Sequence, residues 1–349
     1  MNITKKIPVG VLGATGSVGQ KFIQLLEGHP FFELTEIAAS DRSAGKKYKD
    51  AVNWILSSPI PKGISDMIVK GCEDKFNSPL LFSALDASVA GEIESNLANR
   101  GHFIASNSKN HRWDTNVPLL IPEVNSDHLE LVKTQNYNGG GIVTNPNCST
   151  IGLVLALKPL YDAFGIEALN VVTMQALSGA GYPGVSSLDI IDNVVPFIGG
   201  EEEKLESEPK KILGSLAGDH IDLADLKISA QTNRVAVIDG HLETVQITLK
   251  KKASIAEILK AWDEFSGEPQ KQQLPFAPEK AIHYFMENKY PQPRLHRNID
   301  KGMAVAAGRL RPCSLFDYKF VVLSHNTVRG AAGGSILCAE MMVAQGLMK

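Results

Sequence analysis

The sequence predicts an α/β protein of two domains, with a doubly wound parallel sheet followed by an α+β domain that holds a large mixed or antiparallel sheet. Up to residue 147, short apolar runs of strand length alternate with helical segments, as in repeated βαβ units. Beyond that point, longer strands alternate apolar and polar residues. Such alternation is typical of a sheet with one covered face and one half-solvated face.

The predicted strands of the first domain are buried apolar runs, and helices follow two of them. The strands are Ile7–Leu12, Phe32–Ala39, 79–86, 102–105 and Gly141–Thr144, with helices at 20–26 and 87–97. The domain boundary falls near residue 147. We therefore expect a first domain at 1–147 and a second at 148–326, while 327–349, with a helix at 335–347, packs back on the first.

Glycines follow the first strand in the context of a dinucleotide-binding loop. They recur at positions 10, 13, 16 and 19, a GxxGxxG variant of the GxGxxG fingerprint, between a strand and a helix. Glycines let the backbone approach a pyrophosphate closely, and the helix N-terminus favours its charge. A plain tight turn is the alternative. The predicted cofactor contacts in this loop are Gly13, Thr15, Gly16, Ser17 and Val18.

The end of the second strand should face the adenosine ribose of the cofactor. Arg42 lies there beside Ser40 and Ser43. An arginine at this place accommodates the 2′-phosphate of NADP, whereas an acidic residue binds the 2′-hydroxyl of NAD. NADP is therefore favoured and the first domain is predicted to be a Rossmann-type NADP-binding domain. Asp41 leaves an ambiguity, and a solvated basic loop is the alternative.

The segment Asn145–Thr150 places a cysteine at the start of a helix. Asn147 is a good N-cap, so Cys148 should lie in the first helical turn. There the helix dipole and free backbone N–H groups are expected to lower the thiol pKa and favour a nucleophile. The alternative is a small buried cysteine without a chemical role, as most free cysteines are.

The second domain is predicted to contain strands at 169–177, 227–231, 235–238, 242–250, 303–310 and 319–324. Gln175 is polar within the first of these strands and would need a partner if buried. Arg234 and His241 flank the run 235–238, and a histidine suits proton transfer near neutral pH. A structural role is the competing interpretation for His241. The half-polar strands suggest a face that needs cover, hence a homodimer or homotetramer.

Two further charged segments can be explained as ordinary solvent-exposed structure. Residues 201–211 read as a solvated helix. The polar loop 106–112 could bind an anion through Arg112 and backbone amides, or could be an ordinary surface loop.

Composition excludes several classes of protein. The 349 residues are 44% apolar and 21% charged, with a formal net charge of −3, which argues against a nucleic-acid binder. No apolar run reaches the length of a bilayer span, so no membrane partner and a cytoplasmic location are expected. Four scattered cysteines and nine dispersed histidines argue against disulfides and against a metal.

Taken together, these segments resemble the aspartate-semialdehyde dehydrogenases, in particular the branch found in archaea and fungi. The similarity covers nearly the whole length, in order. Its motifs are GATGSVGQ, ASDRSAGKKY, SNSKNHR with VPLLIPEVN, NPNCST, MQALSGAGYPG, GGEEEK, NRVAVIDGH and HNTVRGAAGGSIL.

The resemblance implies NADP-dependent interconversion of L-aspartate 4-semialdehyde plus phosphate with 4-phospho-L-aspartate through a cysteine thioester. This reaction feeds lysine, threonine, methionine and isoleucine biosynthesis. By resemblance, Cys148 is the nucleophile, His241 the acid/base and Gln175 orients the acyl group. The implied substrate contacts are Arg234 for the α-carboxylate, Glu201 for the ammonium, Lys204 and Arg112 for phosphate, and Asn147 beside the cysteine. The implied further cofactor contacts are Ser83, Ser178, Gly179 and Asn326.

Two other functions remain open from the sequence. A malonyl-CoA reductase resembles the same branch and uses the same thioester chemistry, but its substrate has no ammonium for Glu201. A non-catalytic NADP-sensing module would keep the glycine loop and Arg42 without needing Cys148 and His241 together.

Overall fold

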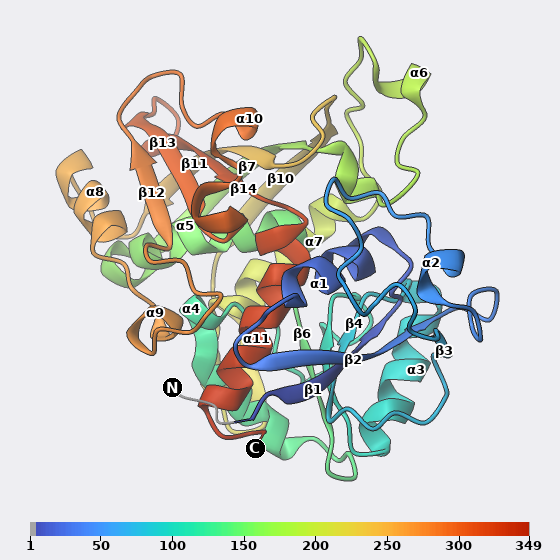
Figure 1. The fold of residues 1–349 in the computed structure, drawn as a ribbon. Helices are drawn as coiled ribbons and strands as arrows, with labels where there is room; N and C mark the ends of the chain where they lie inside the picture. The colour runs from blue at the N-terminus through green and yellow to red at the C-terminus, as the bar shows by residue number, and fades with distance from the viewer. Residues whose placement is uncertain (1–4, 349) are drawn as a thin grey trace.

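The computed structural model describes residues 5–348 and contains two α/β units (Figure 1). The first unit is built on a six-stranded sheet in the order β3-β2-β1-β4-β5-β6, with all neighbours parallel. This order is that of a dinucleotide-binding fold, as predicted. Its elements are β1 Ile7–Leu12, α1 Ser17–Leu26, β2 Phe32–Ala39, α2 Tyr48–Ala51, β3 Lys70–Gly71, β4 Leu80–Ser83, α3 Ala87–Asn99, β5 Phe103–Ser106, α4 Pro122–Asn125, η1 Ser126–Thr134 and β6 Gly141–Thr144.

The second unit holds a mixed six-stranded sheet in the order β10-β7-β11-β14-β13-β12. Strands β10 and β12 run parallel to their neighbours, and the other pairs are antiparallel. The elements that follow β6 in the chain are α5 Cys148–Phe164, β7 Ile166–Gln175, η2 Leu177–Ala180, α6 Ser187–Ile190, α7 Glu201–Ile212, β8 Ser215–Ala217, β9 His220–Asp222, β10 Lys227–Arg234, β11 His241–Leu249, α8 Ile255–Asp263, α9 Glu268–Lys271, β12 Ile282–Phe285, α10 Pro293–His296, η3 Ile299–Gly302, β13 Val305–Pro312, β14 Tyr318–Ser324, η4 Val328–Ala332 and α11 Gly333–Ala344.

The long helices α5 and α11 pack in the cores of different units. Helix α5 lies on the inner face of the mixed sheet, and its residues between Ile151 and Leu160 are almost all buried in that core. Helix α11, red in Figure 1, packs instead into the core of the first unit, where Ile336 and Met341 join residues of β1, α1 and β2. The chain therefore leaves the second sheet and returns to the first unit at its C-terminal end.

The prediction of a strand at 235–238 is wrong. Its apolar β-branched residues have the composition of a strand, but the segment is a turn after β10. It makes a few backbone bonds beside the end of β7, including Val235 N–H to Gln175 O at 3.0 Å and Leu177 N–H to Val237 O at 2.7 Å. Ile238 is 69% exposed, so no sheet face covers this run.

Helix α7 is present, but it is not a solvated helix. One face, which includes Glu201, Leu205, Glu208 and Lys211, is buried, because it packs against α5 and β10. Charged side chains on a buried face need partners, and such a face is a candidate for a functional site.

None of the helices within residues 5–348 is both long and apolar enough to cross a bilayer.

Candidate active site

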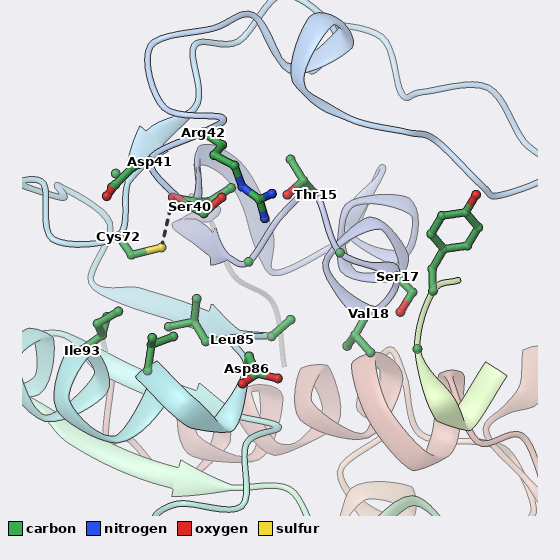
Figure 2. Close-up of a pocket in the computed structure, with 18 of the residues that line it drawn as sticks. Thr15, Ser17, Val18, Ser40, Asp41, Arg42, Cys72, Leu85, Asp86 and Ile93 are labelled. Atoms are coloured by element: carbon green, nitrogen blue, oxygen red, sulfur yellow. Dashed lines mark hydrogen bonds between the residues drawn. The ribbon is translucent and has the colours of Figure 1, made fainter. Parts of the chain in front are cut away.

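A cavity of about 1110 Å³ opens at the carboxyl ends of the parallel strands. It lies between β1 and β4, where the strand order reverses, which is where ligands bind in such sheets. Figure 2 shows the glycine loop and the end of β2 on its wall. The predicted cofactor residues that line it are Gly13, Thr15, Gly16, Ser17, Val18, Ser40 and Arg42. Ser43 and Ser83 are not part of the lining.

The glycine loop fits a dinucleotide. Gly13 has φ +73°, and a Cβ there would lie 2.5 Å from the carbonyl oxygen of Ala84. A Cβ on Gly19 would lie 2.1 Å from the Gly13 carbonyl oxygen. Only glycines permit this close packing of loop, strand and helix. Helix α1 begins at Ser17, which lines the cavity, so the helix N-terminus faces the space where a pyrophosphate would bind.

Three other predicted cofactor residues, Ser178, Gly179 and Asn326, are not part of the lining of this cavity. Ser178 lines an adjoining cavity of about 270 Å³ and accepts a hydrogen bond from Asn326 Nδ2 at 2.7 Å. Asn326 Oδ1 in turn accepts from the Gly240 N–H at 2.8 Å. A Cβ on Gly179 would lie 2.8 Å from Arg234 Nη1 and 3.2 Å from His241 Nε2, so this glycine lets the loop pack closely against both side chains. The loop that contains Ser178 and Gly179 therefore lies beside both the second cavity and His241.

Cys148 and His241 are in direct contact. Cys148 is the first residue of α5, and the Asn147 side chain caps the helix by accepting from the N–H groups of Ser149 and Thr150 at 3.0 and 3.3 Å. His241 is the first residue of β11. Its Nε2 lies 3.2 Å from Cys148 Sγ. The N-cap prediction is confirmed, and a thiol beside an imidazole is the arrangement of an activated nucleophile.

The expected low thiol pKa is wrong for this arrangement. Burial raises the pKa of the Cys148 thiol to about 12, and the nearby Glu201 carboxylate adds to the rise. Arg112, Lys204 and Arg234 lower the pKa, but less than burial raises it. Desolvation disfavours the charged thiolate more than the helix start and the three cations favour it. Cys148 is therefore a neutral thiol here.

His241 is neutral as well, and its proton can be placed. Burial, with the positive charge of Arg234, lowers the His241 pKa to about 3. Its Nδ1 accepts a hydrogen bond from the Ala176 N–H at 3.0 Å. Since a neutral imidazole carries one proton, that proton lies on Nε2, facing the Cys148 sulfur. Ala176 therefore sets the orientation of the ring.

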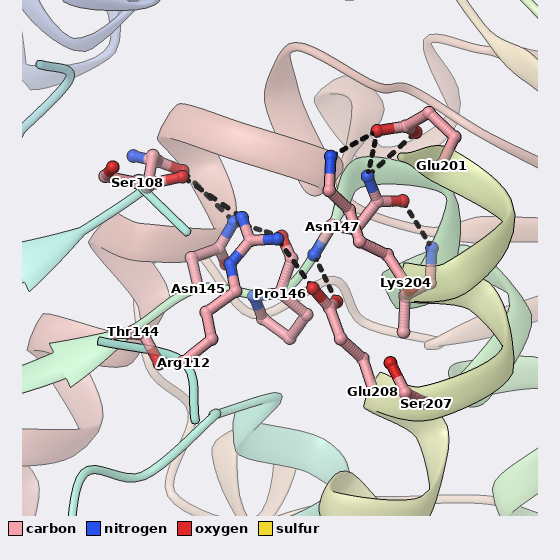
Figure 3. Close-up of polar contacts among 12 residues, drawn as sticks. Ser108, Arg112, Thr144, Asn145, Pro146, Asn147, Glu201, Lys204, Ser207 and Glu208 are labelled. Atoms are coloured by element: carbon pink, nitrogen blue, oxygen red, sulfur yellow. Dashed lines mark hydrogen bonds and ion pairs between the residues drawn. The ribbon is translucent and has the colours of Figure 1, made fainter. Parts of the chain in front are cut away.

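A carboxylate lies beside the cysteine. Glu201, at the start of α7, accepts two hydrogen bonds from Asn147 Nδ2 at 3.0 and 2.8 Å (Figure 3). Lys204 Nζ lies 2.7 Å from Glu201 Oε1, and Gln175 Nε2 lies 3.3 Å from Oε2. Burial raises the Glu201 pKa, but these donors outweigh it and leave the pKa below its ordinary value. Glu201 is therefore an anion that joins three predicted site residues.

Two buried guanidinium groups complete the surroundings. Arg234 donates from Nη1 to the Ala176 carbonyl oxygen at 2.7 Å and is 5% exposed. Arg112 is 6% exposed and donates from Nη1 to Glu208 at 2.7 Å. The positive charges of Arg112 and Arg234 both lower the pKa of the Cys148 thiol. The site thus contains several cations that can bind anionic parts of a substrate.

Sequence reasoning missed Glu208 and Lys211, which share the buried face of α7. Glu208 contacts Arg112, and Lys211 Nζ donates to the carbonyl oxygens of Arg112, Asp114 and Val117 at 2.7 to 2.9 Å. The signal was the spacing of Glu201, Lys204, Glu208 and Lys211, which puts four charges on one helical face. Within residues 5–348, no group of three or more acidic, His or Cys side chains is arranged to hold a metal ion.

Two protein-family models match the chain. The model described as semialdehyde dehydrogenase, NAD binding domain, matches residues 8–132. The model described as semialdehyde dehydrogenase, dimerisation domain, matches residues 157–329. An aspartate-semialdehyde dehydrogenase of Schizosaccharomyces pombe is 51% identical, over 97% of this chain and 99% of the relative. The chain belongs to the aspartate-semialdehyde dehydrogenase family.

Other members of this family span archaea and fungi, which confirms the resemblance to that branch. The aspartate-semialdehyde dehydrogenase of Archaeoglobus fulgidus is 50% identical, over 96% of this chain and 97% of the relative. A crystal structure of the aspartate-semialdehyde dehydrogenase of Candida albicans with NADP has a TM-score of 0.91 at 43% identity, covering 99% of this chain and 100% of that one. The fold and the placement of a nucleotide-binding unit before a dimerisation unit are therefore those of the family.

Proposed function

We propose that the chain is an NADP-dependent aspartate-semialdehyde dehydrogenase that interconverts L-aspartate 4-semialdehyde plus phosphate with 4-phospho-L-aspartate. The observation that carries the proposal is the Cys148–His241 contact at 3.2 Å, where the charges of Glu201, Arg112, Lys204 and Arg234 all act on the thiol. The family and the NADP bound to the Candida albicans relative support it. A sensing module would not need this constellation.

The charged residues suit an amino acid that carries a phosphate. We assign the α-carboxylate to Arg234, the ammonium to Glu201, and the phosphate to Lys204 and Arg112. A guanidinium can bind a carboxylate with two parallel hydrogen bonds, and a buried carboxylate can pair with an ammonium. The anionic Glu201 favours this substrate over a malonyl thioester, which has no ammonium.

Cys148 would attack the acyl carbon of 4-phospho-L-aspartate. The carbon–sulfur bond forms, the carbon–oxygen bond to phosphate breaks, and Lys204 and Arg112 stabilise the leaving phosphate. NADPH, when bound, supplies a hydride for reduction of the thioester. The carbon–sulfur bond of the resulting hemithioacetal then breaks, which releases the semialdehyde and leaves the Cys148 sulfur free, while Gln175 orients the acyl group.

His241 would exchange the protons of these steps through Nε2. A base at Nε2 needs that nitrogen free, so the ring proton must be on Nδ1, and an imidazolium carries protons on both nitrogens. Either form requires release of the hydrogen bond from the Ala176 N–H. The acid/base role therefore includes a change in this contact.

The cofactor would bind with its pyrophosphate on the glycine loop and its 2′-phosphate at Ser40 and Arg42. We assign residues 1–147 to NADP binding and 148–326 to catalysis and dimerisation, with the segment 327–349 returning to the first domain. The roles of Ser43, Ser83, Ser178, Gly179 and Asn326 as cofactor contacts, and a cytoplasmic location, stay predictions.

We further propose a homodimer or homotetramer. The outer face of the mixed sheet carries half-buried residues such as Val172, Met174 and Thr244. Beside it, the segment around α6 projects from the second unit (Figure 1) and exposes Leu188 and Phe197 by 91% and 67%. Apolar side chains this exposed are consistent with cover by another subunit. The dimerisation-domain match supports association.

The assay follows NADPH absorbance with aspartate semialdehyde, NADP and phosphate. We expect NADPH to form only when phosphate is present, and Cys148→Ala to abolish its formation. His241→Asn should lower the rate of hydride transfer more than it weakens binding. Replacing NADP with NAD should lower kcat/KM by about tenfold or more, and Arg42→Ser should narrow that difference. Oxidation of NADPH by malonyl-CoA, without phosphate-dependent turnover, would assign the chain to the acyl-CoA reductases instead.

A further inference from the structure

The Glu208 carboxylate connects two parts of the site that no local sequence signal joins. Its Oε1 accepts from Arg112 Nη1 at 2.7 Å, and its Oε2 accepts from the backbone N–H of Asn147 at 2.7 Å (Figure 3). Glu208 is 1% exposed. One buried carboxylate is therefore shared between a guanidinium and the residue that precedes Cys148.

This contact sets the orientation of the Arg112 side chain. Nη1 is bound by Glu208 and Nη2 donates to the Asn107 carbonyl oxygen at 3.1 Å. The planar guanidinium is thus held at both ends of its fork, while its buried Nε has no partner among residues 5–348. A fork held in this way loses little freedom on binding an anion with its remaining N–H groups.

We propose that Glu208 is the positioning residue of the phosphate subsite, which sets the place of Arg112 relative to the Cys148 nucleophile. The inference rests on the proposed function, because it takes Arg112 as a phosphate ligand. Since Glu208 binds the N-cap residue of the helix that begins with Cys148, a shift of Glu208 changes the distance between the phosphate and the sulfur. Misplacement of reacting groups by about 1 Å costs about a hundredfold in rate.

The chemistry of the contact requires a carboxylate. Both partners of Glu208 are donors, so both of its oxygens must accept. A glutamine has one oxygen, and its NH₂ group would face either the guanidinium or the Asn147 N–H. An aspartate keeps both oxygens but is shorter by one methylene, so it cannot reach both donors from the same helix.

The same helix offers a matched control. Glu206 is half-buried, and its carboxylate accepts from the Ala230 N–H of β10 at 3.0 Å without contacting Arg112. Glu206→Gln removes the same charge from α7 and perturbs a similar carboxylate–amide bond. Any effect common to Glu206→Gln and Glu208→Gln therefore belongs to the helix and not to the phosphate subsite.

The test measures KM for inorganic phosphate, for aspartate semialdehyde and for NADP in the full-length enzyme. For Glu208→Gln we expect KM for phosphate to rise about ten- to a hundredfold, because a misplaced Arg112 loses charge-assisted hydrogen bonding to the anion, with the other two KM values within about twofold. Glu206→Gln should leave all three near wild type. If Glu208→Gln does not fold, Glu208→Asp is measured in its place and should show the same selective rise.

A double-mutant cycle asks whether the effect passes through Arg112. In an Arg112→Ala background, adding Glu208→Gln should change KM for phosphate by less than about twofold. Equal effects in both backgrounds, equal rises in all three KM values, or no difference from Glu206→Gln would each overturn the proposal. Absence of phosphate-dependent turnover in the wild-type protein would instead refute the proposed function, so the two failures are distinguishable.

Discussion

Replacing Arg329 with Met removes one half of an ion pair that lies entirely inside the protein. Arg329 belongs to η4 and donates from Nη1 and Nη2 to the two oxygens of Glu123 at 2.8 and 2.6 Å. The side chains of Arg329 and Glu123 are 1% and 0% exposed. After Arg329→Met, Glu123 would be left as a buried carboxylate without its cation.

The expected cost follows from this burial. Removing one partner of a buried pair destabilises a protein by about 3–5 kcal/mol, since the remaining charge stays desolvated. Replacing both partners with apolar residues of similar size is often nearly neutral. We therefore expect Arg329→Met alone to lose about 3–5 kcal/mol, and Arg329→Met combined with Glu123→Leu to be more stable than either single variant.

The measurement is the melting temperature, followed by calorimetry. A loss of that size should lower the melting temperature of Arg329→Met by roughly 4–7 °C for a chain of 349 residues, and the double variant should recover most of it. Lys133→Met is the control, because its partner Glu130 is about half exposed and the pair should contribute little. If the two single effects simply add in the double variant, the coupling inferred from the structure is refuted.

Three further substitutions test packing, titration and capping. A Cβ on Gly330 would lie 2.8 Å from Cys148 Cβ. Gly330→Ala should therefore lower kcat, and overpacking should lower the free energy of unfolding by about 1–3 kcal/mol. A normal rate of Cys148 alkylation would argue against this contact. Glu243 is buried without a partner among residues 5–348, and burial raises the pKa of its carboxyl well above the ordinary value. Its folded form keeps a proton that the unfolded chain releases above about pH 4.3, so this residue lowers stability as pH rises. Glu243→Gln should therefore gain melting temperature relative to wild type between pH 5 and pH 8, and a constant difference would contradict the assignment. Asn147→Ala removes the helix cap and should cost about 0.5–2 kcal/mol in urea unfolding, whereas an unchanged midpoint would mean the cap contributes nothing.

Local signals predicted the elements well. The strand Phe32–Ala39 has the bounds expected from its apolar run between turn residues. Asn147 caps the helix that begins at Cys148, because a side-chain oxygen next to free N–H groups acts within one turn. The run 235–238 shows the limit of such signals. Its residues favour a strand, but only pairing with another strand makes one, and the chain places no ladder there.

In the candidate site, too, some features could be predicted from the sequence and others could not. Motifs singled out Cys148, His241, Gln175 and Glu201, and the fold brings their side chains together. The spacing along α7 puts Glu208 on a charged helical face, but nothing in the sequence indicated its contacts or the Arg329–Glu123 pair, because the partners lie 61 to 206 residues apart in the chain. A long-range pair leaves no periodic pattern, so only the folded structure reveals it.

By itself, the sequence determined the two-domain α/β architecture, the glycine loop, the helix start at Cys148 and the residue types of the site. These depend on periodicity, on backbone conformation and on groups within one helical turn. The tertiary structure decided the protonation of Cys148 and His241, the fixed fork of Arg112 and the shared carboxylate of Glu208. Those properties depend on desolvation and on charges a few ångströms away in space, and the distance between residues in space is set by the whole fold and not by their distance along the chain.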